Sequence, residues 1–217
     1  WQVPTRENWP LLKRLAGRMG FGFFLYGAIL LTMQADTILV GALGGATLVA
    51  EFVLIWKIAE VVIQIIWRIP ETFVPNLIQL DAKTDTQRLK SLNQATGRWS
   101  VAVSVIAGLV YAVAGATIVE LWVGPEHVPD NAMGYVLAGL VIALMGSSHT
   151  HAMFAYATLR LKELIRVSGV ELLVKLFLAV TLFPFFGYLA PMIGLIAARI
   201  GGVQFAYRNL TRRALGA

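Results

Sequence analysis

Six apolar stretches of this 217-residue chain are each long enough to cross a lipid bilayer, and they restrict the possible folds more than any other feature. They cover residues 20–41, 48–67, 101–122, 133–159, 167–189 and 191–207. The hydrocarbon core offers no water to the backbone, so each span must satisfy its own amides and carbonyls by forming a helix. We therefore expect an all-α integral membrane protein with six transmembrane helices.

The composition agrees with a membrane protein. Charged residues make up only 14% of the chain, whereas they make up about 25% of a soluble domain. The net charge of +6 would suggest nucleic acid in a soluble protein, but most of the cations here lie in the connections between spans. We therefore expect membrane lipids as partners and no nucleic acid.

The cations fall on one side of the predicted membrane. Of the 18 Lys and Arg residues, 15 lie in the two terminal segments and in the connections after the second and fourth spans. The other three connections carry none, and the widest of these contains Glu126 and Asp130. This asymmetry predicts a multi-pass protein with both termini in the cytoplasm.

We expect a single membrane lobe, residues 20–207, with short cytoplasmic ends. Residues 1–19 are predicted to form a juxtamembrane amphipathic segment, and residues 208–217 a tail. The longest polar connection, residues 70–100, is predicted to be a cytoplasmic helical loop with a bend at its two prolines. A capping box at residues 84–87 predicts a helix that runs without a break into the third span.

Small residues at four-residue spacing mark the last span. Gly194, Ala198 and Gly202 lie on one stripe, which predicts close packing of this helix against a neighbour.

Several charged side chains lie inside the spans, where each costs at least about 2.5–3.5 kcal/mol. Lys57 and Glu60 are three residues apart, and Glu171 and Lys175 are four apart. Each set can form a neutralising pair within its helix. Alternatively, the lysines line a polar cavity between helices and bind an anionic headgroup.

Arg199 is the strongest candidate for binding a phosphate, because no acidic residue lies within one turn of it. Its guanidinium can hold a phosphate through two parallel hydrogen bonds. The alternative is an ion pair between helices with Asp36 or Glu60. Asp36 itself is a candidate cation or proton site, or it hydrogen-bonds across helices.

Two histidines lie in a polar stretch of the fourth span. His149 and His151 are two residues apart and therefore point to different faces of a helix, unlike a helical metal pair. A packing or cavity-lining role is favoured. No nucleotide-binding loop, metal-ligand cluster or nucleophile–base motif occurs in the sequence, so we expect neither an enzyme nor a bound metal or cofactor.

Four segments together resemble a known family of membrane proteins. They read DTILVGALGGA at residues 36–46, VLIWKIAE at 53–60, PETFVP at 70–75 and LWVGPE at 121–126. In this order they resemble the polysaccharide flippases of the MOP superfamily, which includes O-antigen and exopolysaccharide exporters, MATE drug exporters and the lipid II flippase. The resemblance extends over nearly the whole chain and is greatest to the C-terminal six-helix lobe.

The resemblance implies a transporter of two six-helix lobes, of which this chain supplies one and a fused or separate chain the other. It also implies a location in the bacterial cytoplasmic (inner) membrane and a substrate, a polyprenyl diphosphate carrying a short glycan. Such a headgroup cannot enter hydrocarbon unaided, because its polar groups would lose water without compensation. Alternating access by rocking of the lobes would move it. The candidate substrate-binding residues are Arg199, Lys57 and Lys175, and the candidate coupling or cavity-lining residues are Asp36, Glu60, Glu171, His149 and His151.

Two other functions fit the same sequence. One is a cation-coupled exporter of amphipathic drugs in the same superfamily, with Asp36 and Glu60 as coupling sites. The other is a non-transporting scaffold subunit of a polysaccharide synthesis complex.

Overall fold

The computed structural model describes the backbone of residues 9–214 and the side chains of residues 34–212. The chain divides into two compact units, Trp1–Ile38 and Leu39–Ala217. The first unit holds the beginning of helix α1, whose helical backbone starts at Trp9. Residues 1–8 of the predicted amphipathic segment lie outside the described residues, so its structure stays a prediction. Every interaction reported below between different helices lies within the second unit.

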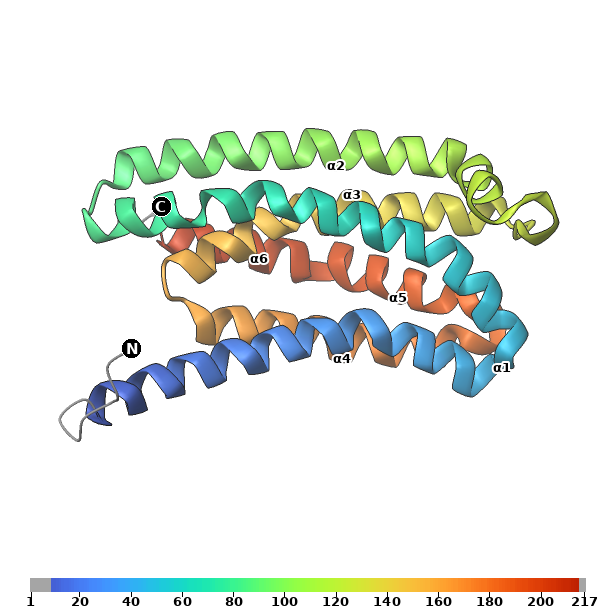
Figure 1. Ribbon diagram of the computed structural model, residues 1–217, viewed down its shortest axis with the longest axis horizontal. Helices are drawn as coiled ribbons and strands as arrows, with labels where there is room; N and C mark the ends of the chain where they lie inside the picture. The colour runs from blue at the N-terminus through green and yellow to red at the C-terminus, as the bar shows by residue number, and fades with distance from the viewer. Residues whose placement is uncertain (1–8, 215–217) are drawn as a thin grey trace, which may run out of the picture. The chain divides into compact units, whose positions relative to one another are not determined.

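Helices joined by short turns make up the described backbone, and no β-strand occurs in it. Along the chain (Figure 1) these are α1 (Trp9–Ala82), α2 (Thr86–Val123), η2 (Pro125–His127), α3 (Ala132–Ala157), α4 (Leu161–Phe186), η3 (Gly187–Leu189), α5 (Ala190–Ala198), η4 (Arg199–Val203) and α6 (Gln204–Ala214). Four helical stretches in the described residues are long and apolar enough to cross a membrane, namely Gln34–Ala82, Thr86–Val123, Ala132–Ala157 and Leu161–Arg212. The prediction of an all-α membrane protein is therefore confirmed at this level, whereas six crossings remain a prediction.

Two of the four long stretches contain a break at a glycine. Gly45 interrupts α1 with φ 76° and ψ −177°, a backbone conformation that other residues rarely adopt. Gly187, with φ 53°, ends α4, and the short helix η3 follows it. Gly45 lies between the first and second predicted spans, and Gly187 lies near the end of the fifth. At the second break the chain reverses, so that α5 packs alongside α4 (Figure 1).

The polar stretch 70–100 is a hairpin of two long helices. Helix α1 stays helical through Pro70 and Pro75 as far as Ala82. Asp85 then caps α2, because its Oδ1 accepts the backbone N–H of Arg88 at 3.1 Å. Helix α2 continues without a break to Val123, as the capping box predicts.

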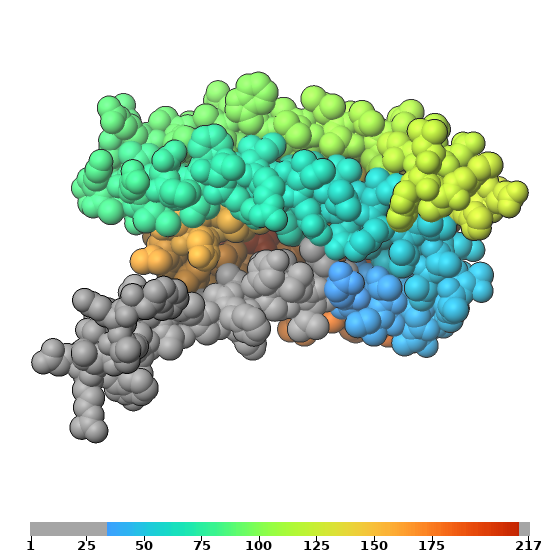
Figure 2. Space-filling view, in the orientation of Figure 1, coloured from blue at the N-terminus to red at the C-terminus, as the bar shows by residue number. Residues whose placement is uncertain are grey.

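Glycines allow α2 and α3 to pack closely. Gly108 and Gly139 face each other, and a Cβ atom at either one would run into the backbone carbonyl oxygen of the other. Helix α2 also contacts α1. Tyr111 of α2 donates its hydroxyl hydrogen to the carbonyl oxygen of Ile55 in α1, at 2.5 Å. The C-terminal part of α1 therefore packs against α2, and Figure 2 shows their side chains meeting along this face.

The glycine stripe of the last span is only partly a packing surface. A Cβ atom at Gly194 would lie 2.8 Å from the carbonyl oxygen of Lys175, so α5 packs directly on α4 there. Gly202 has φ 145° and no atom within 4 Å of such a Cβ. The packing prediction is right for Gly194 and wrong for Gly202, which breaks the helix.

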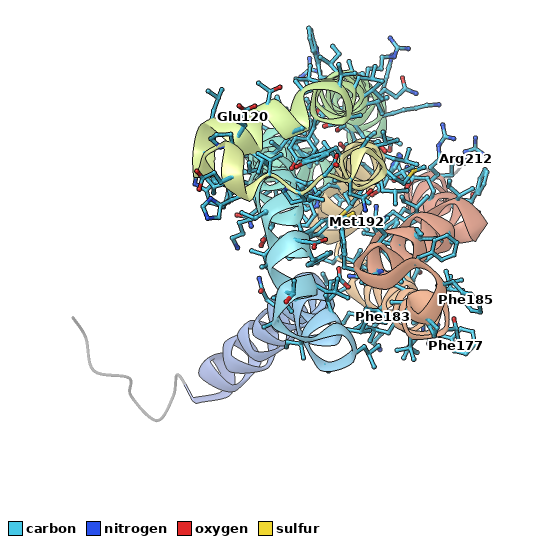
Figure 3. All side chains as sticks on the ribbon, turned by 90° about the vertical axis from the view of Figure 1, so that its right-hand side faces the viewer. Glu120, Phe177, Phe183, Phe185, Met192 and Arg212 are labelled. Carbon is cyan, nitrogen blue, oxygen red and sulfur yellow. The ribbon has the colours of Figure 1, made fainter. Side chains whose placement is uncertain are left out.

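Large apolar side chains also cover the outside of the helices. Val113 of α2 is 87% exposed and Phe185 of α4 is 79% exposed. Figure 3 shows Phe177 and Phe185 at the outer edge of the bundle. An apolar outer surface of this extent suits contact with lipid chains rather than water.

Candidate functional site

A buried ion pair joins α4 to the last helix. Glu171 lies on α4 and Arg199 is the first residue of η4, and each side chain is only 6% exposed. Nε of Arg199 donates to Oε1 of Glu171 at 2.7 Å, and Nη2 lies 2.5 Å from the same oxygen. Charge-assisted contacts of this kind are the strong hydrogen bonds of protein interiors.

The third nitrogen of the guanidinium binds α3. Nη1 of Arg199 donates to the hydroxyl oxygen of Ser148 and, at 3.2 Å, to the carbonyl oxygen of Leu144. These contacts provide the hydrogen bonds that a buried arginine requires. Through this one side chain, η4 is therefore fixed to both α3 and α4.

The second carboxylate oxygen of Glu171 is also bound. The hydroxyl of Tyr207 in α6 donates to Oε2 of Glu171 at 3.1 Å, and the ring centroid of Tyr207 lies 5.9 Å from Cζ of Arg199. Oγ of Ser168, one turn before Glu171, lies 3.0 Å from the Tyr207 hydroxyl. We call Glu171, Arg199, Ser148, Tyr207 and Ser168 the buried polar cluster.

The last helix is interrupted beside this cluster. The segment Arg199–Val203 is a single turn of π-helix, and Gly202 within it has φ 145° and ψ −24°. Turns of π-helix occur often at functional sites, and a helix bends where its hydrogen-bond ladder is broken. Arg199 thus stands at a break in the helix and not in a regular span.

The structure corrects the expected surroundings of Arg199. Within the second unit, its acidic partner is Glu171, which is 28 residues away in the sequence, whereas Glu60 pairs with Lys57. The absence of an acid within one turn therefore does not leave Arg199 free for a phosphate. Glu171, for which the sequence predicts a pair with Lys175 in its own helix, bonds to Arg199 and Tyr207. Lys175 is buried one turn further along α4, with 1% exposure.

Lys57 and Glu60 form the predicted pair within α1. Nζ of Lys57 lies 2.9 Å from Oε2 of Glu60, and Nε2 of Gln64 donates to Oε1 of Glu60 at 3.2 Å. The Lys57 side chain is 50% exposed, whereas that of Glu60 is 6% exposed. Lys57 therefore belongs to a group separate from the buried polar cluster, so the structure does not assemble it with Arg199 in one cavity.

The two histidines face different neighbours, as their spacing predicts. The ring of His149 stacks on Trp67 of α1 at 4.5 Å between centroids, and its Nε2 lies 3.4 Å from Oε1 of Glu71. Nδ1 of His151 lies 2.9 Å from Oγ1 of Thr211 in α6. Each histidine thus joins α3 to another helix. Within residues 34–212, the structure brings no three His, Asp or Glu side chains together as metal ligands.

Asp36 belongs to the first unit, Trp1–Ile38. Its side chain is 2% exposed, on the helical backbone of α1 nine residues before the break at Gly45.

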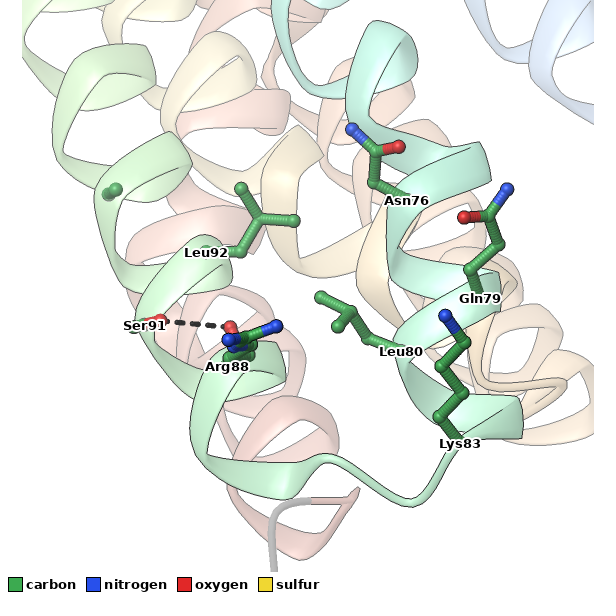
Figure 4. A pocket seen from close by; sticks show the side chains of 8 residues that line it. Asn76, Gln79, Leu80, Lys83, Arg88, Ser91 and Leu92 are labelled. Carbon is green, nitrogen blue, oxygen red and sulfur yellow. Dashed lines mark hydrogen bonds between the residues drawn. The ribbon is translucent and has the colours of Figure 1, made fainter.

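An open pocket lies at the α1–α2 hairpin, with a cavity volume of about 540 Å³. Lys83 in the turn after α1 and Arg88 at the start of α2 line it, and Asn76, Gln79 and Ser91 add polar groups (Figure 4). Sequence reasoning assigned these cations to a cytoplasmic loop and did not predict a pocket.

Several residues of the buried polar cluster were not among the predicted site residues. Tyr207, Ser168 and Ser148 were missed. Gln204, whose Nε2 donates to Oγ of Ser147 at 3.2 Å, lies outside the cluster and was missed as well. Gln204, Tyr207 and Thr211 follow each other at spacings of three and four residues, which places them on one face of a helix. This polar face of the last helix was the sequence pattern that could have identified Gln204 and Tyr207.

Comparisons of the chain with models of known protein families, with curated proteins and with solved structures gave no match.

Proposed function

We propose that this chain is one lobe of a transporter that flips a lipid-linked oligosaccharide, a polyprenyl diphosphate carrying a glycan, across the bacterial cytoplasmic membrane. One observation carries the proposal: a buried arginine–carboxylate pair stands at a break in an apolar helix. Ionisable residues inside membrane helices are costly and commonly belong to substrate or ion pathways. Interrupted helices near such residues are a recurring feature of secondary transporters.

The proposed role of Arg199 follows from the geometry of its guanidinium. The fork that contacts Glu171 has the shape that binds a phosphate, so a substrate diphosphate can take the place of the carboxylate. Lys175 lies four residues after Glu171, at the spacing at which it can neutralise that carboxylate while Arg199 binds substrate. Exchange of partners would release η4 and α6 from α4 and thereby couple substrate binding to a movement of helices.

The distribution of charged connections supports the orientation that we propose, with six crossings and both ends in the cytoplasm. The α1–α2 turn, which contains Lys83, and the α3–α4 turn, which contains Arg160, lie at the same end of the bundle (Figure 1). The α2–α3 connection with Glu126 and Asp130 lies at the opposite end (Figure 1). The positive end is the cytoplasmic one by the positive-inside rule.

A transporter of this kind also requires a second lobe, because alternating access moves one helical bundle against another. We therefore propose a second six-helix lobe, fused or separate, as the partner of this chain.

The test is a flipping assay in liposomes that contain both lobes. A fluorescent polyprenyl diphosphate glycan is added on both sides, and a glycosidase outside trims the accessible glycan. Transport would convert the protected half of the substrate to the trimmed form, whereas liposomes with this chain alone should keep it protected. Arg199→Lys retains the charge but loses the fork, so we expect flipping to fall at least tenfold.

Two results would contradict the proposal. Substrate that stays protected in the presence of both lobes would favour a scaffold role. Efflux of an amphipathic cationic dye driven by a sodium or proton gradient, without glycan flipping, would identify a drug exporter. Lys162→Gln serves as the control, since it removes an exposed cation of α4 that is not part of the buried polar cluster.

A further inference from the structure

An apolar groove runs between α4 and the last helix, on the outside of the second unit. Its cavity volume is about 400 Å³. Val170 and Val174 form part of one wall, and Ala198, Gly201 and Val203 form part of the other. Arg166 is the one charged residue among those that line the groove. None of its lining residues belongs to the buried polar cluster, so the groove is a separate site.

The groove exists because the two helices diverge. They touch at Gly194, where a Cβ atom would lie 2.8 Å from the carbonyl oxygen of Lys175. Two turns later, a Cβ atom at Gly201 would meet nothing within 4 Å. The π-helical turn and the absence of side chains on Gly201 and Gly202 leave this space open. The same π-helical turn begins with Arg199, whose side chain belongs to the buried polar cluster.

The charge of the groove is confined to one end. Arg166, Val170 and Val174 follow each other at four-residue spacing, so they form a stripe along α4 of about 12 Å. Arg166 is exposed and begins this stripe, close to the α3–α4 turn. The site therefore combines an apolar slot with a single cation at the end that holds the positively charged connections.

We propose that this groove binds an anionic phospholipid of the membrane, with one acyl chain in the slot and the phosphate on Arg166. The apolar slot offers no hydrogen-bonding partners to the hydroxyls of a sugar, whereas an acyl chain needs no hydrogen bonds. The guanidinium matches a phosphate in geometry and charge. Basic sites between transmembrane helices on the cytoplasmic side commonly bind anionic lipid headgroups. This inference goes beyond the transport proposal and does not depend on it.

The test is lipid binding to the purified, delipidated chain in detergent, followed by native mass spectrometry. Phosphatidylglycerol and phosphatidylcholine with identical acyl chains are titrated separately. We expect one phosphatidylglycerol to bind about tenfold more tightly than phosphatidylcholine, because the choline cation of phosphatidylcholine offsets the attraction between its phosphate and Arg166. Glycerol phosphate, which has the headgroup chemistry without chains, should not bind at the same concentrations.

Two variants separate the slot from the cation. Gly201→Leu fills the groove and should weaken binding of both lipids at least tenfold. Arg166→Gln should abolish the preference for phosphatidylglycerol, because it should weaken phosphatidylglycerol binding more than phosphatidylcholine binding. The matched controls are Gly169→Leu, at a helical glycine of α4 that also has no atom within 4 Å of a Cβ, and Lys162→Gln. Neither of these residues lines the groove.

Size-exclusion elution and the thermal unfolding midpoint show whether each variant is folded. If Gly201→Leu does not fold, Val170→Phe fills the groove from the opposite wall and replaces it. Equal binding of the two lipids by the unmodified chain would overturn the proposal. A loss of lipid affinity in Gly169→Leu as large as that in Gly201→Leu would also overturn it, as would binding of glycerol phosphate as tight as that of the lipid.

Discussion

Arg199 and Glu171 stand 28 residues apart in the sequence and form a buried ion pair between η4 and α4, with Nε of the arginine 2.7 Å from the carboxylate. The pair has further hydrogen bonds to Ser148 and Tyr207, so each charged group has more than one hydrogen-bonding partner. An ion pair with these additional hydrogen bonds tolerates burial, but removal of one partner takes the opposite charge away from the other. The stability of the chain should therefore depend on both residues together.

The first prediction concerns the loss of one partner. Arg199→Ala removes the arginine partner of the buried Glu171 and should lower the stability of the chain by about 3–5 kcal/mol. Its accumulation in the membrane and its thermal unfolding midpoint in detergent should both fall. The double variant with Glu171→Gln and Arg199→Gln removes both charges and should recover most of the loss. Equal destabilisation by the single and double variants would contradict the pairing.

The second prediction concerns the contact between α2 and α3. A Cβ atom at Gly139 would lie 2.9 Å from Cβ of Ala112, so Gly139→Ala should force the two helices apart at a cost of about 1–3 kcal/mol. Gly169→Ala makes the same chemical change on α4, where space is open, and should stabilise its helix by about 0.5–1 kcal/mol. Thermal unfolding of both variants in detergent measures the difference. A lower unfolding midpoint for Gly169→Ala would contradict the prediction, because it would show that the gain in helix propensity does not determine the stability of this variant.

The sequence was sufficient for properties that depend on local patterns. The helical breaks near Gly45 and Gly187, the start of α2 after Asp85 and the pairing of Lys57 with Glu60 each depend on a few neighbouring residues. Turn chemistry, capping and helical periodicity act at that range. The histidine spacing likewise predicted two separate environments for His149 and His151.

Partners from distant helices could not be read in the same way. Arg199 had no acid nearby in the sequence, and its pairing with Glu171 depends on how α4 and η4 pack. The turn of π-helix at residues 199–203 also shifts the faces of the last helix relative to a regular one. A regular stripe of Gly194, Ala198 and Gly202 was therefore expected, although Gly202 ends the regular packing. Without the three-dimensional arrangement, Arg199 remained a candidate for binding a phosphate, with an ion pair to Asp36 or Glu60 as the alternative.

The third prediction concerns the start of α2. Asp85→Ala removes the side chain that accepts the N–H of Arg88 and should cost about 1 kcal/mol. Amide hydrogen exchange in the first turn of α2 should accelerate, whereas exchange in the middle of the helix should not change. Asp81→Ala removes the same charge from the other side of the turn and provides the control. Faster exchange with Asp81→Ala alone would point to an effect of charge and not of capping.

The last prediction concerns the number and direction of the membrane crossings. The chain contains no cysteine, so single cysteines at exposed positions can be labelled without background. A membrane-impermeant maleimide added outside intact cells should label cysteine in place of Thr47 or Glu126, and should reach Lys83→Cys only after the membrane is permeabilised. Thr47 lies two residues after the break at Gly45. If α1 crosses the membrane twice, Thr47 is outside and Lys83 inside. Labelling of both positions from the same side would show that α1 does not cross the membrane once between Thr47 and Lys83. Labelling in the reverse sense would invert the orientation.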